Sequence, residues 1–386
     1  MSAFDLVRPL EDAWQSVLDG VLAKIGAPKT SDVARLSPKL AELSRAYNEG
    51  AAGADKKPVP IEARIAFSFA RDVPKGAAAV RELVTAGLLR PSPTLRILDV
   101  GAGLGAMTWG VVRALEAAGL EGKVESLLVD ADARALEVAT KIAAAAPRGK
   151  IELVITTRTQ RVGAKLPQAD LVIVGQVLSE LDTDLDPQAR IEKHAAFVSE
   201  LLRDSVVEGG ALVVVEPALR DRTRHLHAVR DRLVGAGTTV FAPCLHADAC
   251  PALAKEEDWC HEDVAVDLPN WLVPLARAAG LRFQGLTFSH LVLRKDDGRL
   301  VTRLKEGGLR LRVVSDVMRT KGKTELFACT AAGQRVRLRR LERDEKASPS
   351  GWEELHRGDV LTVIPAPDEN GRLSPTVEID VWPSRN

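Results

Sequence analysis

The chain has 386 residues, enough for two or three domains that each bury a core. Its 53 basic and 53 acidic residues balance, so any nucleic-acid-binding surface must be local. No apolar run approaches the roughly 20 residues of a membrane span, and the opening MSAFDLVRPLEDAWQ lacks the features of a signal or transit peptide. These features predict no membrane partner and, by default, a cytoplasmic protein.

The first 90 residues have the spacing of helices. Apolar side chains recur every three or four positions between Phe4 and Ile25. Ser37 followed by Pro38 suggests an N-cap with proline at the first helical position. A second helical stretch is expected to end near Leu89.

From residue 95, short apolar strands alternate with helices, which is the pattern of a parallel sheet. The fold class expected is therefore α/β, with a Rossmann-like domain. After Gly280, the runs LRFQGLTF and SHLVLRK predict a hairpin that adds one antiparallel strand to the sheet. The expected strands are Arg96–Val100, Ser126–Asp130, Ile151–Thr156, Ala169–Val174 and Ala211–Glu216, and the expected helices include Met107–Ala118 and Ala133–Ala145.

Beyond Asp296 the helical patterns stop, and short apolar runs predict a small β domain, in the manner of an OB-fold barrel. Three parts are thus expected: a helical region over residues 1–90, a Rossmann-like domain over 91–298 with a Cys-rich insertion at 241–263, and a basic β domain over 299–386. The strands expected in the last part are Leu309–Val314, Glu325–Cys329, Val336–Leu341 and Val360–Val363.

The string ILDVGAGLGAMTW follows a predicted strand and opens a helix, the setting of a nucleotide-binding turn. Its glycines permit a tight turn and a close approach of a ligand to the backbone. Read as Gly-x-Gly-x-x-Ala, the same string also fits a dinucleotide fingerprint. A carboxylate two positions before the first glycine favours the cationic methionine end of S-adenosylmethionine over a pyrophosphate, and an acid at the end of the next strand could bind ribose hydroxyls. The predicted cofactor-binding residues are Asp99, Gly101, Ala102, Gly103, Gly105 and Asp130.

Two further positions bear on the chemistry. The third strand offers Thr156, Thr157 and Arg158 where an acid near the adenine is common. Beyond the fourth strand, GQVLSEL replaces the acceptor motif of amino-group methyltransferases, and Gln176, Ser179 and Glu180 are the candidates to orient a methyl acceptor. The sequence therefore supports cofactor binding better than any particular methyl transfer.

Three of the four cysteines, Cys244, Cys250 and Cys260, lie within seventeen residues, in a polar segment rich in proline. Soft thiolates suit an iron–sulfur cluster or a structural zinc. The spacing lacks paired C-x2-C knuckles, while His246 and His261 keep a zinc site with three cysteines and one histidine open. With Cys329 as a fourth ligand, the site would join the β domain to the Rossmann-like domain.

Residues 301–346 carry thirteen basic and six acidic side chains. Alternate arginines on a predicted strand project from one face and could lie along an RNA backbone, although a charge run is often only a solvated face. The RNA-binding candidates are Arg319, Lys321, Lys323, Arg335, Arg337 and Arg339.

Taken with the LDVGAG string, VLSEL after the fourth strand, VEP at the fifth and the APC…CP…WCH segment, the chain resembles the Rsm-twenty-two (Rsm22) family over about residues 60 to 345. Members are methyltransferase-like proteins associated with the small ribosomal subunit, known from mitochondria and bacteria. The resemblance implies a role in rRNA methylation or subunit assembly. It also implies a 4Fe–4S cluster bound by Cys244, Cys250, Cys260 and Cys329.

Three functions follow as hypotheses. The first is a methyltransferase that acts on RNA of the small subunit. The second is a ribosome-assembly factor that binds RNA on a methyltransferase scaffold without turnover. The third is a methyltransferase of small molecules with a structural zinc. The oligomeric state, the RNA site and the methylated atom are not evident from the sequence.

Overall fold

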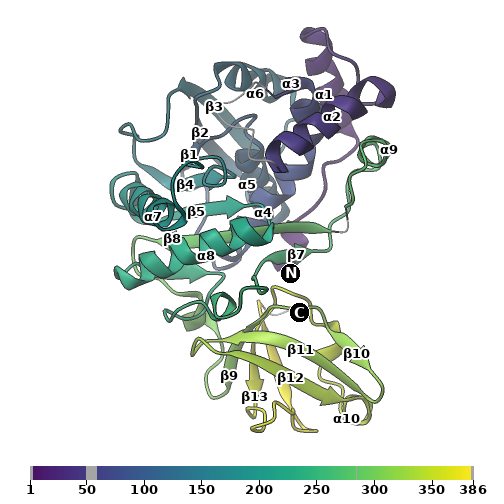
Figure 1. Cartoon of the computed structure of the whole chain (residues 1–386), viewed down its shortest axis with the longest axis vertical. Helices are drawn as coiled ribbons and strands as arrows, with labels where there is room; N and C mark the ends of the chain where they lie inside the picture. The colour runs from purple at the N-terminus through teal and green to yellow at the C-terminus, as the bar shows by residue number, and fades with distance from the viewer. Residues whose placement is uncertain (1–2, 49–58, 284, 384–386) are drawn as a thin grey trace.

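The computed structural model describes residues 3–48, 59–283 and 285–383, which form an α/β body and a second, smaller β-sheet (Figure 1). The larger sheet has the strand order β3-β2-β1-β4-β5-β8-β6, with β7 paired to β8. Neighbours from β1 to β5 run parallel, and β8 is antiparallel to β5. This order confirms a Rossmann-like methyltransferase fold with a mainly parallel sheet. The strands are β1 (Thr94–Val100), β2 (Gly122–Asp130), β3 (Ile151–Thr159), β4 (Ala169–Gly175), β5 (Val206–Glu216), β6 (Val240–Ala242), β7 (Glu262–Val264) and β8 (Leu286–Arg294).

Helices cover both faces of this sheet, which explains its almost continuously apolar strands. On one face, Ile97 and Ile173 pack with the helices α4 and α5, and on the other, Leu98 and Val172 pack with α7 and α8. The helices of this body are α4 (Phe69–Thr85), α5 (Ala106–Ala117), α6 (Ala133–Ala145), α7 (Pro187–Asp204), α8 (Arg220–Gly235) and α9 (Val273–Ala278).

The expected hairpin after Gly280 is wrong. Only the end of the first run, Leu286–Phe288, is a strand, and it continues into the second run as the single strand β8, which pairs with β5, β6 and β7. The strand is buried on both faces, with only Thr287 exposed, so its sequence carries no alternation to mark where a turn would lie. The predicted antiparallel strand is therefore present, but its partners beside β5 are β6 and β7, at the two ends of the segment that contains the cysteines.

Helices precede the sheet, as the apolar spacing predicts. They are a 3-10 turn η1 (Ala3–Leu6), α1 (Ala13–Lys24), α2 (Val33–Asn48), α3 (Ile61–Ala63) and a π-helical turn η2 (Arg64–Ser68) that runs directly into α4. Pro38 lies inside α2 rather than at its start, which corrects the predicted N-cap at Ser37. The helix begins at Val33, so Pro38 is its sixth residue and removes the backbone hydrogen bond that the Ala34 carbonyl would otherwise accept.

Helices α4 and α5 cross unusually closely because both carry glycine at the crossing. A Cβ built on Gly110 would lie 2.2 Å from the carbonyl oxygen of Val73 and 2.7 Å from Cα of Gly76. The contact is with backbone, which cannot move aside as a side chain can. The crossing fixes the distance between the N-terminal helices and the glycine turn that opens α5.

Replacing Gly110 by alanine is therefore expected to destabilise the protein by about 2 kcal/mol, because overpacking outweighs the better helix propensity of alanine. Gly20, inside α1 with no atom within 4 Å of a built Cβ, is the matched control. Gly20→Ala should raise the stability by up to about 1 kcal/mol. Urea unfolding of both variants measures the effects, and equal shifts would contradict the close crossing.

The second sheet follows a 3-10 turn η4 (Leu300–Arg303) and encloses its own apolar core, which includes Leu311, Leu326 and Trp352. Its order is β10-β11-β9-β13-β14, with β12 paired to β11. Each of the four runs expected as a strand contributes one, while β10, β14 and the short helix α10 (Glu342–Ala347) are additional. The strands are β9 (Leu309–Val313), β10 (Met318–Thr320), β11 (Lys323–Thr330), β12 (Arg335–Leu341), β13 (Val360–Ile364) and β14 (Glu378–Trp382).

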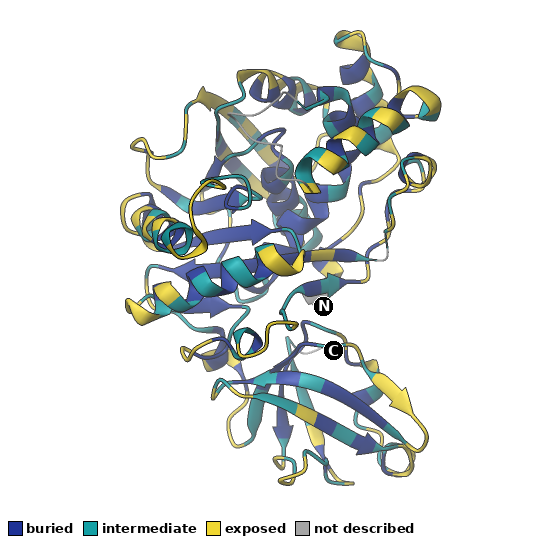
Figure 2. Cartoon of the chain, viewed as in Figure 1, coloured by how far each residue is buried: buried dark blue, intermediate teal, exposed yellow. Residues whose placement is uncertain are grey.

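All strand pairs of this sheet are antiparallel. Arg339 of β12 also exchanges backbone hydrogen bonds with Gly371 and Leu373, so the sheet curls toward itself. The OB-like description and the three domain boundaries remain predictions. Figure 2 shows that the central strands of the larger sheet are mostly buried, whereas β10 is exposed and β12 is exposed in part.

A buried ionic cluster joins the two sheets. Arg312 of β9 donates to Glu82 of α4 at 2.5 Å and to Glu262 of β7 at 3.0 Å, and Arg81 donates to Glu262 at 2.7 Å. The four side chains are at most 4 % exposed. Helix α4 therefore contacts the cysteine segment and the second sheet at its C-terminal end, while its N-terminal end contacts the functional site.

Candidate functional site

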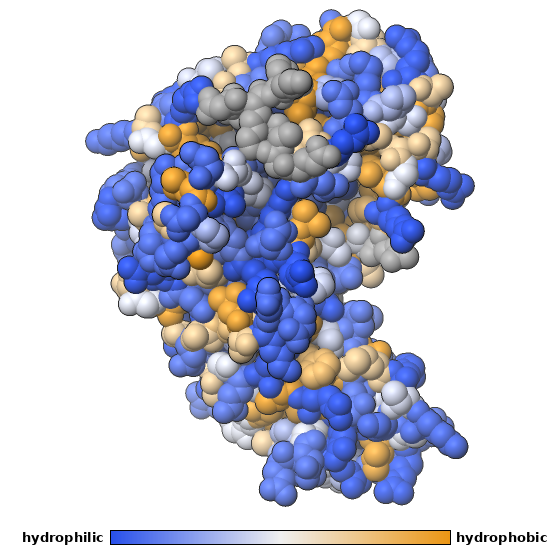
Figure 3. All heavy atoms as spheres, viewed as in Figure 1, coloured by the Kyte–Doolittle hydropathy of each residue, from blue (hydrophilic) through white to orange (hydrophobic). Residues whose placement is uncertain are grey.

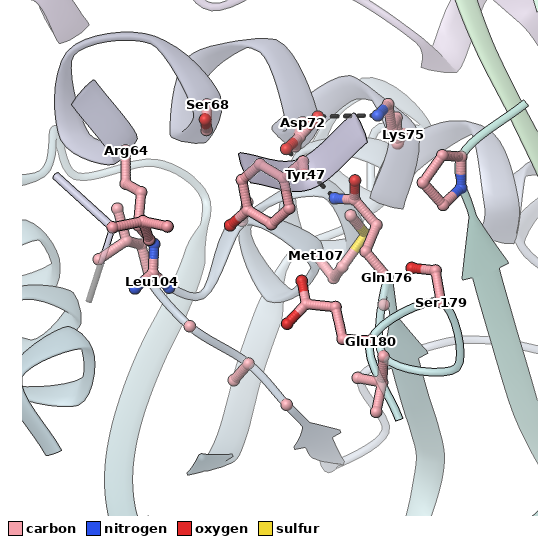
Figure 4. Close-up of a pocket in the computed structure, with 18 of the residues that line it drawn as sticks. Tyr47, Arg64, Ser68, Asp72, Lys75, Leu104, Met107, Gln176, Ser179 and Glu180 are labelled. Atoms are coloured by element: carbon pink, nitrogen blue, oxygen red, sulfur yellow. Dashed lines mark hydrogen bonds and ion pairs between the residues drawn. The ribbon is translucent and has the colours of Figure 1, made fainter. Parts of the chain in front are cut away.

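A cavity of about 1320 Å³ lies at the carboxyl ends of β1, β2 and β4. The strand order reverses between β1 and β4, and ligands of open α/β sheets bind at such switch points. Residues of α2, η2 and the first turns of α4 complete the wall opposite the sheet (Figure 4). The cavity exceeds the range typical of single-ligand sites, which leaves room for a cofactor and an acceptor group.

The glycine turn forms the floor of this cavity. Gly101, Gly103 and Gly105 all have positive φ, and a Cβ on Gly101 would lie 2.3 Å from the Val177 side chain. The Asp130 carboxylate accepts a hydrogen bond from the backbone N–H of Gly103 at 2.7 Å. The structure thus brings Asp130 together with the turn, and Gly101, Ala102, Gly103 and Asp130 line the cavity, whereas Gly105 lies at the start of α5 outside it.

Asp99 lies behind the turn and does not line the cavity. Its side chain is fully buried, and one oxygen accepts hydrogen bonds from the Thr108 hydroxyl and backbone N–H at 2.8 and 3.3 Å. Its Oδ1 has no partner among the described residues. Burial raises the pKa of Asp99 to about 7, so a cation nearby would favour its ionised form.

Gln160 is a site residue that the sequence did not indicate. Strand β3 continues to Thr159, three residues beyond the predicted end, and Gln160 follows it beside Asp130. Gln160 lines the cavity, and its buried Nε2 has no hydrogen-bond partner in the described part of the chain. Thr156, Thr157 and Arg158 do not line the cavity. An unpaired buried amide costs free energy, which a ligand with an acceptor group would recover.

The three acceptor candidates, Gln176, Ser179 and Glu180, all line the cavity beyond the end of β4. The Gln176 amide donates to Asp72 at 3.2 Å, and its backbone has a φ of 61° (Figure 4). Asp72 in turn pairs with Lys75 at 2.9 Å.

Arg71, Asp72 and Lys75 line the cavity from α4 and were missed in the sequence. The signal was present as three charges in FARDVPKGAAAV, an otherwise apolar helix. Burial by itself raises the pKa of Asp72. The positive charges of Arg71 and Lys75 outweigh burial and hold this pKa well below its usual range.

Glu216, at the end of β5, holds in place the loop from Gln176 to Leu181, called the acceptor loop below. Its carboxylate accepts hydrogen bonds from the backbone N–H groups of Leu178 and Ser179 at 2.8 and 3.1 Å. Burial raises the pKa of Glu216 to about 7. Arg190 of α7 fixes the same loop from the other side, by donating to the carbonyl oxygens of Leu178 and Leu181 at 2.6 and 3.0 Å.

The four cysteines form no disulfide, and they lie in one region between the two sheets. Burial, and then the charges of Cys250, Cys244 and Cys329, raise the pKa of Cys260 well above its usual value. The thiol of Cys329 lies 3.4 Å from Nε2 of His246. Across the described ranges, however, no three His, Cys, Asp or Glu side chains lie close enough to hold a metal ion. The chemistry of the donors fits a soft metal, while their side-chain positions do not form a coordination shell.

The basic candidates lie on the second sheet. Arg335, Arg337 and Arg339 occupy alternate positions of β12, whose intervening residues Leu338 and Arg340 are buried. Several have acidic partners: Arg319 pairs with Glu353, Arg335 with Asp258, and Arg337 and Lys323 with Glu325. Lys321 lies in the turn between β10 and β11.

A family model, described as mitochondrial small ribosomal subunit Rsm22, matches residues 73–343, more than two thirds of the chain. The chain belongs to the Rsm22 family. The matched range of this Rsm22-family chain includes the glycine turn, the acceptor loop and all four cysteines. No curated protein matches the chain.

Solved structures similar to this Rsm22-family chain include methyltransferases. A putative class I S-adenosylmethionine-dependent methyltransferase from Listeria monocytogenes is 15% identical, with a TM-score of 0.36 over 73% of this chain and 86% of that chain. The N-methyltransferase NodS from Bradyrhizobium japonicum, in complex with S-adenosyl-L-homocysteine, is 12% identical, with a TM-score of 0.32 over 65% and 96%. The 16S rRNA methylase ArmA is 13% identical, with a TM-score of 0.27 over 47% and 76%. Scores this low carry no argument about activity, and the fold rests on the strand order.

Proposed function

We propose that the cavity binds S-adenosylmethionine. The observation that carries this proposal is the convergence of the glycine turn, Asp130 and the unpaired amide of Gln160 at the ends of β1, β2 and β3. Asp130 would accept from the ribose hydroxyls with its remaining lone pairs, and Gln160 would bind the adenine edge. The methionine end would lie toward Asp99, whose unpaired oxygen favours a nearby ammonium group.

The Gln160→Ala variant is expected to weaken the binding of S-adenosylmethionine about 5- to 10-fold, because one hydrogen bond to the adenine is lost. Arg158→Ala is the matched control, since Arg158 is exposed on the same strand and does not line the cavity. Titration calorimetry compares the two variants. Equal affinities of the two variants for S-adenosylmethionine would show that Gln160 does not bind the adenine.

The acceptor would enter the side of the cavity lined by Gln176, Ser179 and Glu180. The bound cofactor supplies an electrophilic methyl group on a sulfonium, which is itself the leaving group. The loop held by Glu216 and Arg190 would place the nucleophilic atom in line with this methyl group, and catalysis would consist mainly of that positioning. We propose RNA of the small ribosomal subunit as the acceptor, because the description of the matching family names that subunit.

Binding without turnover is the second candidate, because two acceptor candidates are already engaged within the protein. Gln176 donates to Asp72, and the backbone N–H of Ser179 donates to Glu216. Such a protein would act in subunit assembly. Incubation of the intact protein with labelled S-adenosylmethionine and immature small subunits separates the candidates: label in rRNA supports methylation, and RNA binding without label supports assembly. Methylation only of small molecules would contradict both.

The four cysteines support a 4Fe–4S cluster, with zinc as the alternative. Four thiols reach one region from two separate parts of the chain, the segment 241–263 and strand β11. The guanidinium of Arg230 is buried nearby: burial lowers its pKa, but the charges of Cys244, Asp231 and Cys250 raise it above its usual value. Thiolates are the ligands such clusters use. The cluster would hold the second sheet against the cysteine segment.

Anaerobically purified protein is expected to contain about four irons and four sulfides per chain. Cys329→Ser should lower both strongly, whereas Thr320→Ser, at an exposed position of β10 in the same sheet, should not. Zinc without sulfide, lost in a His246→Ala variant, would contradict the cluster and favour a site with three cysteines and one histidine.

The basic residues Arg319, Lys321, Lys323, Arg335, Arg337 and Arg339 are proposed to contact rRNA. Lys323, Arg335, Arg337 and Arg339 share one face of β11 and β12, called the basic face below, whereas Arg319 lies opposite the buried Thr324 and so on the other face of the sheet. No described helix is long and apolar enough to cross a membrane. The cytoplasmic location remains a proposal beside a family description that names the mitochondrial subunit.

A further inference from the structure

The outer face of β11 and β12 carries an aromatic side chain among its arginines. Phe327 lies directly opposite Arg337 in the antiparallel pair, and Cys329 lies opposite Arg335. Directly opposed residues share one face of a sheet. The intervening Leu326, Ala328 and Leu338 point into the core on the other side. Phe327, half-buried, is therefore part of the basic face rather than of the core.

The basic side chains of this face alone would contribute little to the free energy of RNA binding, because most of them are already paired with an acid. Arg337 and Lys323 lie 3.3 and 2.9 Å from the same carboxylate of Glu325. A phosphate must displace this carboxylate to bind either side chain, so each exchange gains only modest free energy. Figure 3 shows hydrophilic side chains over most of the lower part of the molecule in this view, interrupted by a few apolar ones.

Flat side chains lie both on this face and on the cysteine segment, which an ion pair joins to it. The Arg335 guanidinium lies over the Phe327 ring, 5.6 Å from its centroid, and also pairs with Asp258. Asp258 precedes Trp259, whose ring stacks on His261 with centroids 5.7 Å apart and planes 18° apart. All of these side chains are partly exposed. Together, Phe327, Arg335, Trp259 and His261 are called the stacking edge below.

We propose that the stacking edge binds unpaired bases of a single-stranded RNA segment, while the backbone of the segment follows Arg337, Arg339 and Lys321. Stacking on aromatic rings and guanidinium planes is the common mode for unpaired bases, and the bases of a duplex already stack on each other. The inference rests on the proposed RNA-binding function and specifies the form of RNA that the face takes.

The test compares two RNAs of one sequence with the intact, cluster-loaded protein: a strand of about 12 nucleotides and a hairpin that pairs it. Fluorescence anisotropy is expected to show that Phe327→Ala weakens the single strand about 10-fold or more without changing the dependence on salt. Phe327→Tyr should keep the wild-type affinity. Arg337→Ala should instead lower the salt slope by about 1 for both RNAs.

The outcomes separate the two proposals. Wild-type affinity of Phe327→Ala for the single strand, or equal binding of strand and hairpin, would overturn the stacking edge and leave the RNA function in place. Binding of neither RNA by the wild type would overturn the RNA function itself. Unchanged metal content in Phe327→Ala shows that the neighbouring Cys329 is undisturbed, and thus that any lost affinity belongs to the ring.

Discussion

The Arg312→Ala variant is expected to lose about 3–5 kcal/mol of stability, the largest effect of any single replacement considered. Arg312 contacts both carboxylates of the buried cluster, Glu82 and Glu262. Without it, only Arg81 would remain to compensate two charges that are almost fully buried. Leaving a charge buried and unpaired costs far more than a lost surface ion pair.

The loss should depend on pH in a defined direction. In the wild type, burial alone would raise the pKa of Glu262. The positive charges of Arg81 and Arg312 outweigh burial and hold this pKa well below its usual range. The pair therefore stabilises the fold above about pH 4.5, and this contribution fades as the pH falls further. In the variant the carboxylates can take up protons, so the deficit relative to the wild type should shrink from pH 8 to pH 5.

Urea unfolding at both pH values measures this effect. Arg310→Ala is the matched control, because Arg310 is two residues away on β9 and its guanidinium only donates to the Val301 carbonyl at 3.4 Å. It should lose less than about 1 kcal/mol. A similar, pH-independent loss in both variants would show that the buried cluster does not stabilise the contact between the sheets.

The Asp99→Asn variant is expected to be more stable than the wild type at pH 8, by about 2–4 kcal/mol. Burial raises the pKa of Asp99 to about 7, so above the ordinary carboxyl pKa of 3.8 the folded protein holds a proton that the unfolded chain releases. Stability is therefore lost as the pH rises from about 4 to 7, and the penalty is complete above 7. Asparagine removes the penalty because it does not ionise, and it can still accept from Thr108.

The same group links protons to the cofactor. If an ammonium group binds near the unpaired oxygen of Asp99, the pKa of Asp99 falls and a proton is released on binding near pH 6.5. Calorimetry in two buffers of different ionisation enthalpy measures this release. Glu125→Gln, at an exposed acid of β2 that does not line the cavity, is the control and should retain the release. A release that persists in Asp99→Asn would assign it to another group.

The parallel sheet was predictable because each strand is an apolar run bounded by turn residues. Helix α6, Ala133–Ala145, begins and ends where the sequence indicates, since Asp132 is an N-cap whose side chain accepts from the backbone of Ala135. The glycine turn and Asp130 were predictable for a similar reason. A positive φ favours glycine, and an acid directly after an apolar run is visible in the sequence itself.

The parts of the site that were missed depend on contacts between distant segments. Gln160 was missed because the end of a parallel strand is set by its neighbour: Thr159 pairs with Asp130. Asp72 and Lys75 lie on a helix, and charged residues on a helix usually indicate its solvent-exposed side. Only the structure shows that these two line a cavity. Conversely, the cysteines read as a metal site, but the distance of Cys329 from the others depends on how the second sheet packs.

Titration of the intact protein with S-adenosylmethionine tests the central claim most directly, with NAD as the comparison ligand. We predict saturable binding of one S-adenosylmethionine per chain, weakened in Gln160→Ala and unchanged in Arg158→Ala, with no competition from NAD. Binding of NAD in preference, or no binding of S-adenosylmethionine by a folded sample, would contradict the assignment of the cavity.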